Sequence, residues 1–182
     1  MITVDHMRVE LRPITPGDWR ALHLWGGDER ACRYQSWGPN TPDRSREFTA
    51  EAAAAWQATP IRRRVYVATV EGDVIGSGEL RIHSERHRQG EIQYIVNPRW
   101  WGRGVATQVG RRLLHVAFIQ LDLHRVFATC DPRNIGSQRV LTKLGMTVEG
   151  TLRHTMKLSD GWRDSTVCGV LRDEWPSGHD TE

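Results

Sequence analysis

The sequence predicts an α+β fold with a largely antiparallel sheet. Two observations carry this prediction. From Arg64 onward the apolar period changes from about 3.6 residues to 2, as expected where helices give way to strands. Two glycine-bearing turns of hairpin length, residues 71–73 and 160–161, then join strand-like runs that are consecutive in the chain, which favours antiparallel pairing.

The first half of the chain is predicted to hold a strand, two helices and three further strands. Alternating apolar and charged residues identify the first strand. Thr15-Pro16 and Thr41-Pro42 each place a capping hydroxyl before a proline in the first turn, which predicts a helix after each pair. The segment between these helices, residues 26–40, is predicted to be irregular. The six elements cover residues 7–13, 15–24, 41–58, 65–70, 74–83 and 91–96.

The second half continues with a helix, a strand, a helix and a final hairpin. The helix that begins near Val105 places its apolar residues largely on one side, and the next helix ends at Gly145 as its C′ residue. No repeat or linker interrupts the pattern, so we expect a single domain over residues 1–175 and a polar tail over residues 176–182. The five elements cover residues 105–121, 125–130, 135–144, 146–158 and 162–171.

Composition excludes several classes of protein. The 182 residues include 38% apolar residues, enough for one buried core, and no apolar run approaches the length of a membrane span. We therefore expect no membrane partner and a cytoplasmic location. The net charge is +3, but the arginines are spread along the chain without a basic stripe, so no nucleic-acid partner is expected. The three cysteines share no metal-type spacing, which predicts reduced thiols and no metal site.

A glycine loop between a strand and a helix is the most informative local feature. Gly102 and Gly104 lie between the strand that ends at Val96 and the helix that begins near Val105. First-turn N–H groups lack intrahelical acceptors, and the helix dipole favours an anion at that end. The spacing fits neither the P-loop nor the dinucleotide fingerprint. Arg99 and Arg103 flank the loop, as a ligand carrying negative charge favours.

Three blocks of sequence together resemble one family. The pattern R-x-x-G-x-G followed by V-A-T at residues 99–107 resembles the pyrophosphate-binding signature of the GNAT acyl-CoA N-acyltransferases. The block N-x-x-S-x-x-V-x-x-K-x-G-M-x-x-E-G-x-x-R at residues 134–153 is similar to the RimJ/RimL-type branch, as is G-W-R-D at residues 161–164. Enzymes of that branch acetylate protein N-termini, including those of ribosomal proteins.

The resemblance implies a fold, a co-substrate and a set of binding residues. The GNAT fold is a single mixed, mostly antiparallel sheet of about seven strands flanked by about four helices. Acetyl-CoA is the implied co-substrate, with its pantetheine paired along the strand edge and its pyrophosphate on the loop amides. Asn134 is implied as a hydrogen-bond partner of pantetheine. The implied CoA-binding residues are Ile95, Val96, Arg99, Gly102, Arg103, Gly104, Val105, Ala106, Thr107, Asn134 and Ser137.

The catalytic residues are less completely specified. The family implies the Val96 N–H as the donor to the oxyanion. Many GNAT enzymes protonate the thiolate with a tyrosine seven residues after the Asn134 position, but this chain has Leu141 there, so Ser137 is predicted to take its place. Glu91 is predicted as the general base, with a solvated strand-end carboxylate as the alternative. Related enzymes place carboxylates where this chain has Thr129 and Met156; His83 and His154 are alternative bases.

We therefore expect a cytoplasmic bacterial N-acetyltransferase that moves an acetyl group directly from acetyl-CoA to a primary amine. A protein N-terminus is the predicted acceptor. A small-molecule amine such as an antibiotic or amino-acid derivative is one alternative, and a non-catalytic acyl-CoA-binding module is another. A homodimer is compatible with the sequence, as is a longer acyl donor. Four aromatic residues are either acceptor contacts or core residues: Trp25, Tyr34, Trp37 and Trp56.

Overall fold

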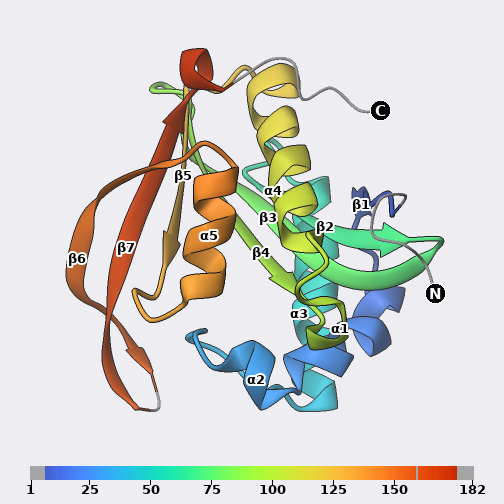
Figure 1. Cartoon of the computed structure of the whole chain (residues 1–182). Coiled ribbons are helices and arrows are strands. Elements are labelled where there is room, and N and C mark those ends of the chain that lie inside the picture. Colours follow the sequence, from blue (N-terminus) through green and yellow to red (C-terminus); the bar gives the residue numbers. More distant parts are fainter. Residues whose placement is uncertain (1–6, 159, 176–182) are drawn as a thin grey trace.

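A seven-stranded sheet forms the centre of the molecule (Figure 1). The computed structural model describes residues 7–158 and 160–175. The strands lie in the order β1-β2-β3-β4-β5-β7-β6, and every neighbouring pair is antiparallel except β4 and β5. The strands are β1 (Glu10–Pro13), β2 (Arg63–Val70), β3 (Asp73–Ser84), β4 (Gln89–Val96), β5 (Arg125–Cys130), β6 (Thr147–Leu158) and β7 (Gly161–Leu171). The predicted mixed, mostly antiparallel α+β fold is confirmed.

The helices depart from the prediction in one place. Segment 26–40, predicted to be irregular, contains a four-residue helix whose N-terminus is capped by the Asp28 carboxylate, which accepts from the Arg30 N–H. The described chain therefore has five α-helices where about four were expected. They are α1 (Trp19–Gly26), α2 (Glu29–Cys32), α3 (Pro42–Ala54), α4 (Val105–His115) and α5 (Ile135–Lys143). The predicted tail, residues 176–182, lies outside the described residues.

Two apolar clusters cover the two faces of the sheet. Successive residues of β2 show the division, because side chains alternate between the faces of a strand. Val65 and Val67 pack with the cluster that includes Trp25 of α1, whereas Tyr66 and Ala68 pack with the larger cluster that includes α4. Figure 1 shows α1 and α3 on one side of the sheet and α4 on the other. Within the described residues, no helix is long and apolar enough to span a membrane.

The one parallel pair is short. β4 pairs with β5 only through Gln89–Glu91 and Arg125–Phe127, and β4 then continues for five residues without a partner on that side. The chain between the two strands contains α4, as a parallel connection requires. The divergence leaves backbone groups of β4 unpaired in the middle of the sheet, beside the N-terminus of α4.

Candidate active site

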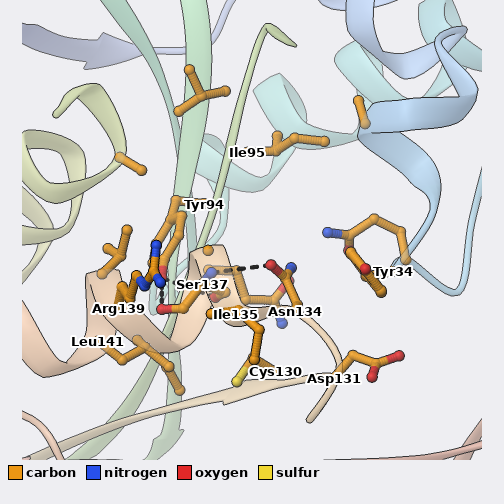
Figure 2. Close-up of a pocket in the computed structure, with 18 of the residues that line it drawn as sticks. Tyr34, Tyr94, Ile95, Cys130, Asp131, Asn134, Ile135, Ser137, Arg139 and Leu141 are labelled. Carbon is orange, nitrogen blue, oxygen red and sulfur yellow. Dashed lines mark hydrogen bonds between the residues drawn. The ribbon is translucent and has the colours of Figure 1, made fainter. Parts of the chain in front are cut away.

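A cavity of about 820 Å³ opens where β4 and β5 diverge. Its walls come from the α2 segment, β4, the glycine loop, β5, α5 and the β6–β7 hairpin. Figure 2 shows side chains from β4, α5 and the segment that carries Tyr34 pointing into this space. The cavity therefore joins the loop predicted to hold a pyrophosphate with Tyr34 and Trp37, two of the residues considered as acceptor contacts.

The glycine loop has the backbone conformation that the anion-binding prediction requires. Gly102 and Gly104 have φ angles of 75° and 76°, in the left-handed region that favours glycine. Gly104 is the N-cap residue of α4, so the next three N–H groups have no acceptor within the helix. The loop residues that line the cavity are Gly102, Gly104, Val105, Ala106 and Thr107. Arg99 and Arg103 lie outside the lining, and the Arg103 guanidinium packs over the Trp100 ring.

The backbone of β4 presents Val96 to the cavity. The Asn97 N–H donates to the Ile75 carbonyl of β3 at 2.9 Å. In an antiparallel pair, successive residues point their N–H and C=O groups alternately toward and away from the partner strand, so Val96, which precedes Asn97, points its groups away from β3. Val96 therefore points its N–H and C=O toward the gap beside β5. The Trp101 indole N–H donates to the Val96 carbonyl at 2.8 Å from that side.

The same alternation corrects the expectation for Ile95. Its N–H and C=O point toward Ser77 of β3, with which it is paired, and they are not available to a ligand in the gap. Ile95 is nevertheless among the residues that line the cavity. Of the two residues predicted to pair with pantetheine, Val96 alone offers backbone groups there.

Asn134 and Ser137 lie at the start of α5, and both line the cavity. The Asn134 carboxamide oxygen accepts from the Ser137 N–H at 3.0 Å and so caps the helix, which leaves the amide N–H groups of Asn134 for a ligand. The Ser137 hydroxyl lies 3.1 Å from the Tyr94 hydroxyl of β4 (Figure 2). Burial raises the pKa of Tyr94 well above its ordinary value, so this phenol stays protonated. Sequence reasoning gave Tyr94 no role.

Glu91 does not reach the cavity. The residue is buried, 9% exposed, and its carboxylate lies 2.9 Å from His83 Nε2, from whose N–H it accepts a hydrogen bond. The His83 ring in turn packs edge-on against Phe127. Neither Glu91 nor His83 is among the lining residues, and His154 also lies elsewhere, where its ring stacks on Trp162. The structure therefore does not bring the predicted base together with Val96 and Ser137.

The charged groups of the cavity wall are mostly cationic. Among the described residues that line it, Asp131 is the one carboxylate, and both of its oxygens accept from the Arg133 guanidinium. Burial alone would raise the pKa of Asp131, but the hydrogen bonds from Arg133 outweigh it, so the pKa lies below its usual value. The cations of the lining are Arg30, Arg133, Arg139, Lys143 and Arg163.

Arg163 of β7 is the buried member of this set and was missed from the sequence. Its side chain is 6% exposed. It donates to the Tyr34 carbonyl at 3.0 Å and to the Ser165 hydroxyl at 2.8 Å, and its Nε has no partner among the described residues. The first of these bonds ties the segment after α2 to the β6–β7 hairpin across the cavity.

Two of the four aromatic residues considered as acceptor contacts line the cavity. Tyr34 and Trp37 are among its lining residues. Trp25 is buried in the core beside α3, and Trp56 donates its indole N–H to the Val65 carbonyl and packs edge-on against Tyr66. The residues that face a ligand are therefore those in the segment after α2, the part of the chain whose local structure the sequence did not predict.

Comparison with known proteins agrees with this geometry. The family model for the acetyltransferase (GNAT) domain matches residues 8–147. The chain belongs to the GNAT acetyltransferase family. It is 26% identical to the uncharacterized N-acetyltransferase YnaD of Bacillus subtilis, over 92% of this chain and 96% of that protein. It is 25% identical to the spermidine N(1)-acetyltransferase of Escherichia coli, over 95% and 91% of the two chains.

A solved structure supports the branch. Mycobacterium smegmatis RimJ, in complex with CoA-disulfide, superposes with a TM-score of 0.78 at 25% identity and covers 94% of this chain and 88% of its own. The predicted resemblance to RimJ-like GNAT enzymes is thereby confirmed, and the protein is an N-acetyltransferase. Enzymes of this family take the acetyl group from acetyl-CoA. The relatives thus include both RimJ and a spermidine N(1)-acetyltransferase.

Proposed function

We propose that this GNAT enzyme transfers an acetyl group from acetyl-CoA to the α-amino group of a protein N-terminus. The observation that carries the choice of acceptor is the charge of the cavity wall. A polyamine is a polycation and needs free carboxylates, whereas the one carboxylate of the described lining is bound to Arg133. A peptide N-terminus brings a single amine, which reacts in its neutral form, and a polar backbone.

The proposal gives each group at the diverging strands a task. The first-turn N–H groups of α4 and the two left-handed glycines would hold the pyrophosphate. The Val96 N–H would donate to the oxygen of the tetrahedral intermediate, and the Ser137 hydroxyl to the departing sulfur. Holding amine and thioester together in one cavity itself supplies a large part of the rate enhancement.

In this proposal Glu91 does not take the proton from the amine by direct contact. Its carboxylate is bonded to His83 outside the cavity lining. A role for Glu91 would have to pass through His83 or through solvent. The amine instead loses its proton to groups at the mouth of the cavity or to water, which is adequate when proximity supplies most of the acceleration.

Transfer is proposed to be direct, without an acetylated enzyme. Cys130 is the cysteine of the cavity lining, and burial raises its pKa to about 11. A thiol becomes a good nucleophile only as the thiolate, and near neutral pH very little of Cys130 is ionised. Both substrates would therefore be bound together when the acetyl group moves.

The test measures free-thiol release from acetyl-CoA with a panel of amines. The panel holds peptides that differ in their N-terminal residue, the same peptides with a blocked α-amine and an internal lysine, and spermidine. We expect only the free α-amines to accelerate thiol release, with the acetyl group located there by mass spectrometry. Faster turnover of spermidine than of every peptide would overturn the acceptor proposal, and no acceleration by any amine would favour the non-catalytic acyl-CoA-binding alternative.

The remaining expectations belong to the same proposal. A protein that uses acetyl-CoA and acts on newly made proteins would work in the cytoplasm. Residues 1–175 would act as one catalytic domain, since a single sheet runs through the described part of that range. Light scattering of the purified chain would decide whether it forms the homodimer that the sequence allows.

A further inference from the structure

The Tyr94 hydroxyl lies against Ser137 and has no task yet in the proposed reaction. Tyr94 comes from β4 and Ser137 from α5, and the two side chains lie next to each other at one side of the cavity (Figure 2). Their oxygens lie 3.1 Å apart, and the Tyr94 hydroxyl lies 3.4 Å from the Ser137 carbonyl oxygen. The rest of the tyrosine ring is held between apolar neighbours, since Tyr94 packs against the main core.

We propose that Tyr94 is a positioning residue that directs the Ser137 hydroxyl toward the sulfur of CoA. This inference rests on the proposed transfer reaction. A serine hydroxyl has one proton and rotates freely, so it is an unreliable donor unless something fixes it. When Tyr94 donates to the Ser137 oxygen, the proton of Ser137 is left to point into the cavity.

The position of Leu141 supports this assignment. Leu141 occupies the place where many GNAT enzymes carry the tyrosine of α5, and it lines the same cavity. Its side chain has no proton to donate. The phenol in this chain instead comes from β4 and reaches the helix one turn earlier, at Ser137. The chain thus keeps a phenol beside the predicted sulfur site but places a serine hydroxyl between them.

The proton balance of the step needs no net transfer from either hydroxyl. The neutral amine attacks the thioester carbon, the C–N bond forms, and the nitrogen carries an extra proton. When the intermediate collapses, the C–S bond breaks and its electron pair goes to sulfur. The nitrogen releases one proton to solvent and the thiolate takes up one proton from solvent, so the two transfers balance. Ser137 stabilises the developing thiolate with a hydrogen bond, and Tyr94 keeps that bond oriented.

The surroundings of Tyr94 suit a fixed donor. Burial disfavours the tyrosinate, so the phenol keeps its proton throughout the range in which the enzyme is assayed. The oxygens within hydrogen-bond distance of the Tyr94 hydroxyl, among the described residues, both belong to Ser137, and the core packing holds the ring in place. Because the Tyr94 hydroxyl hydrogen-bonds with Ser137 alone among the described residues, it restricts the Ser137 hydroxyl to a narrow range of orientations.

The test is a double-mutant cycle on turnover. Tyr94→Phe keeps the ring and its packing and removes only the hydroxyl. We expect kcat to fall by roughly three- to tenfold, the range of one neutral hydrogen bond, while the dissociation constant for acetyl-CoA measured by calorimetry stays the same. Ser137→Ala should cost more, because it removes the donor itself. Adding Tyr94→Phe to Ser137→Ala should cost nothing further.

Tyr66→Phe is the matched control. Tyr66 is a buried tyrosine in the same core cluster that Tyr94 packs against, but it contacts Trp56 and does not line the cavity. This variant should keep kcat unchanged, which separates loss of a buried hydroxyl from loss of this one.

An equal fall in kcat on Tyr94→Phe in the wild-type and Ser137→Ala backgrounds would overturn the inference, because Tyr94 would then act without Ser137. An unchanged kcat in Tyr94→Phe would overturn it as well. The assay uses whichever amine the wild-type enzyme acetylates, so a wrong choice of acceptor does not affect this result.

Discussion

Replacing Gly104 tests the phosphate cradle directly. Gly104 has a φ of 76°, and a Cβ built there would meet no atom within 4 Å. Alanine therefore fits sterically and costs only the left-handed conformation, about 1–2 kcal/mol. For a domain of this size each kcal/mol lowers Tm by roughly 2–4 °C, so we expect Gly104→Ala to melt roughly 2–8 °C lower and to bind CoA with a modest loss.

Gly104→Glu has the same backbone cost and adds a negative charge beside the first turn of α4. A unit charge about 4 Å from one phosphate charge costs about 1 kcal/mol in water and about 4 kcal/mol at an effective dielectric constant of 20. The dissociation constant for CoA, measured by calorimetry, should therefore rise by roughly fivefold to a thousandfold over that of Gly104→Ala. Equal affinity of the two variants, with both still folded, would refute the assignment of the pyrophosphate to this loop.

Three further changes probe the neighbouring groups. Trp101→Phe removes the donor to the Val96 carbonyl and should lower Tm by roughly 1–6 °C in a thermal melt. Cys130→Ala should keep kcat within about threefold, and the wild-type enzyme should yield no acetylated protein in mass spectra without an amine, because the Cys130 thiol is protonated. Asp131→Asn should be less stable than wild type at neutral pH, and the difference should shrink below about pH 4, because the lowered pKa of Asp131 stabilises the fold only while the carboxylate is ionised.

Most of the fold could be predicted because its elements are long and strongly patterned. The strand over Arg125–Cys130 was predicted with the bounds that the structure has, and α4 begins at Val105 as the glycine loop indicates. The helix α2 could not be predicted, because four residues are too few to show a helical period. Its presence depends on the Asp28 cap and on burial of Cys32 against the rest of the molecule.

The sequence predicts those parts of the site that are formed by residues close together in the chain. The loop between Gly102 and Thr107 and the Asn134 cap of α5 both arise from short local spacings. The Tyr94–Ser137 contact joins residues 43 positions apart, and only the tertiary fold brings them together. The alternation of β4 does place Tyr94 on the same face as Ile92 and Val96, so the orientation of its side chain, though not its partner, could have been read from the pattern.

The short pairing of β4 with β5 explains why the parts of the site occur together. A parallel connection needs a helix, and the helix that returns from the end of β4 begins beside the last residues of that strand. If β4 and β5 paired along their whole length, the Val96 N–H would bond to β5 and no cavity would separate the strands. Because pairing stops at Glu91, the unpaired N–H of Val96 and the unpaired N–H groups of α4 face the same space. One topological feature thus supplies both an oxyanion donor and an anion cradle, and a change that extended the pairing would stabilise the sheet while closing the site.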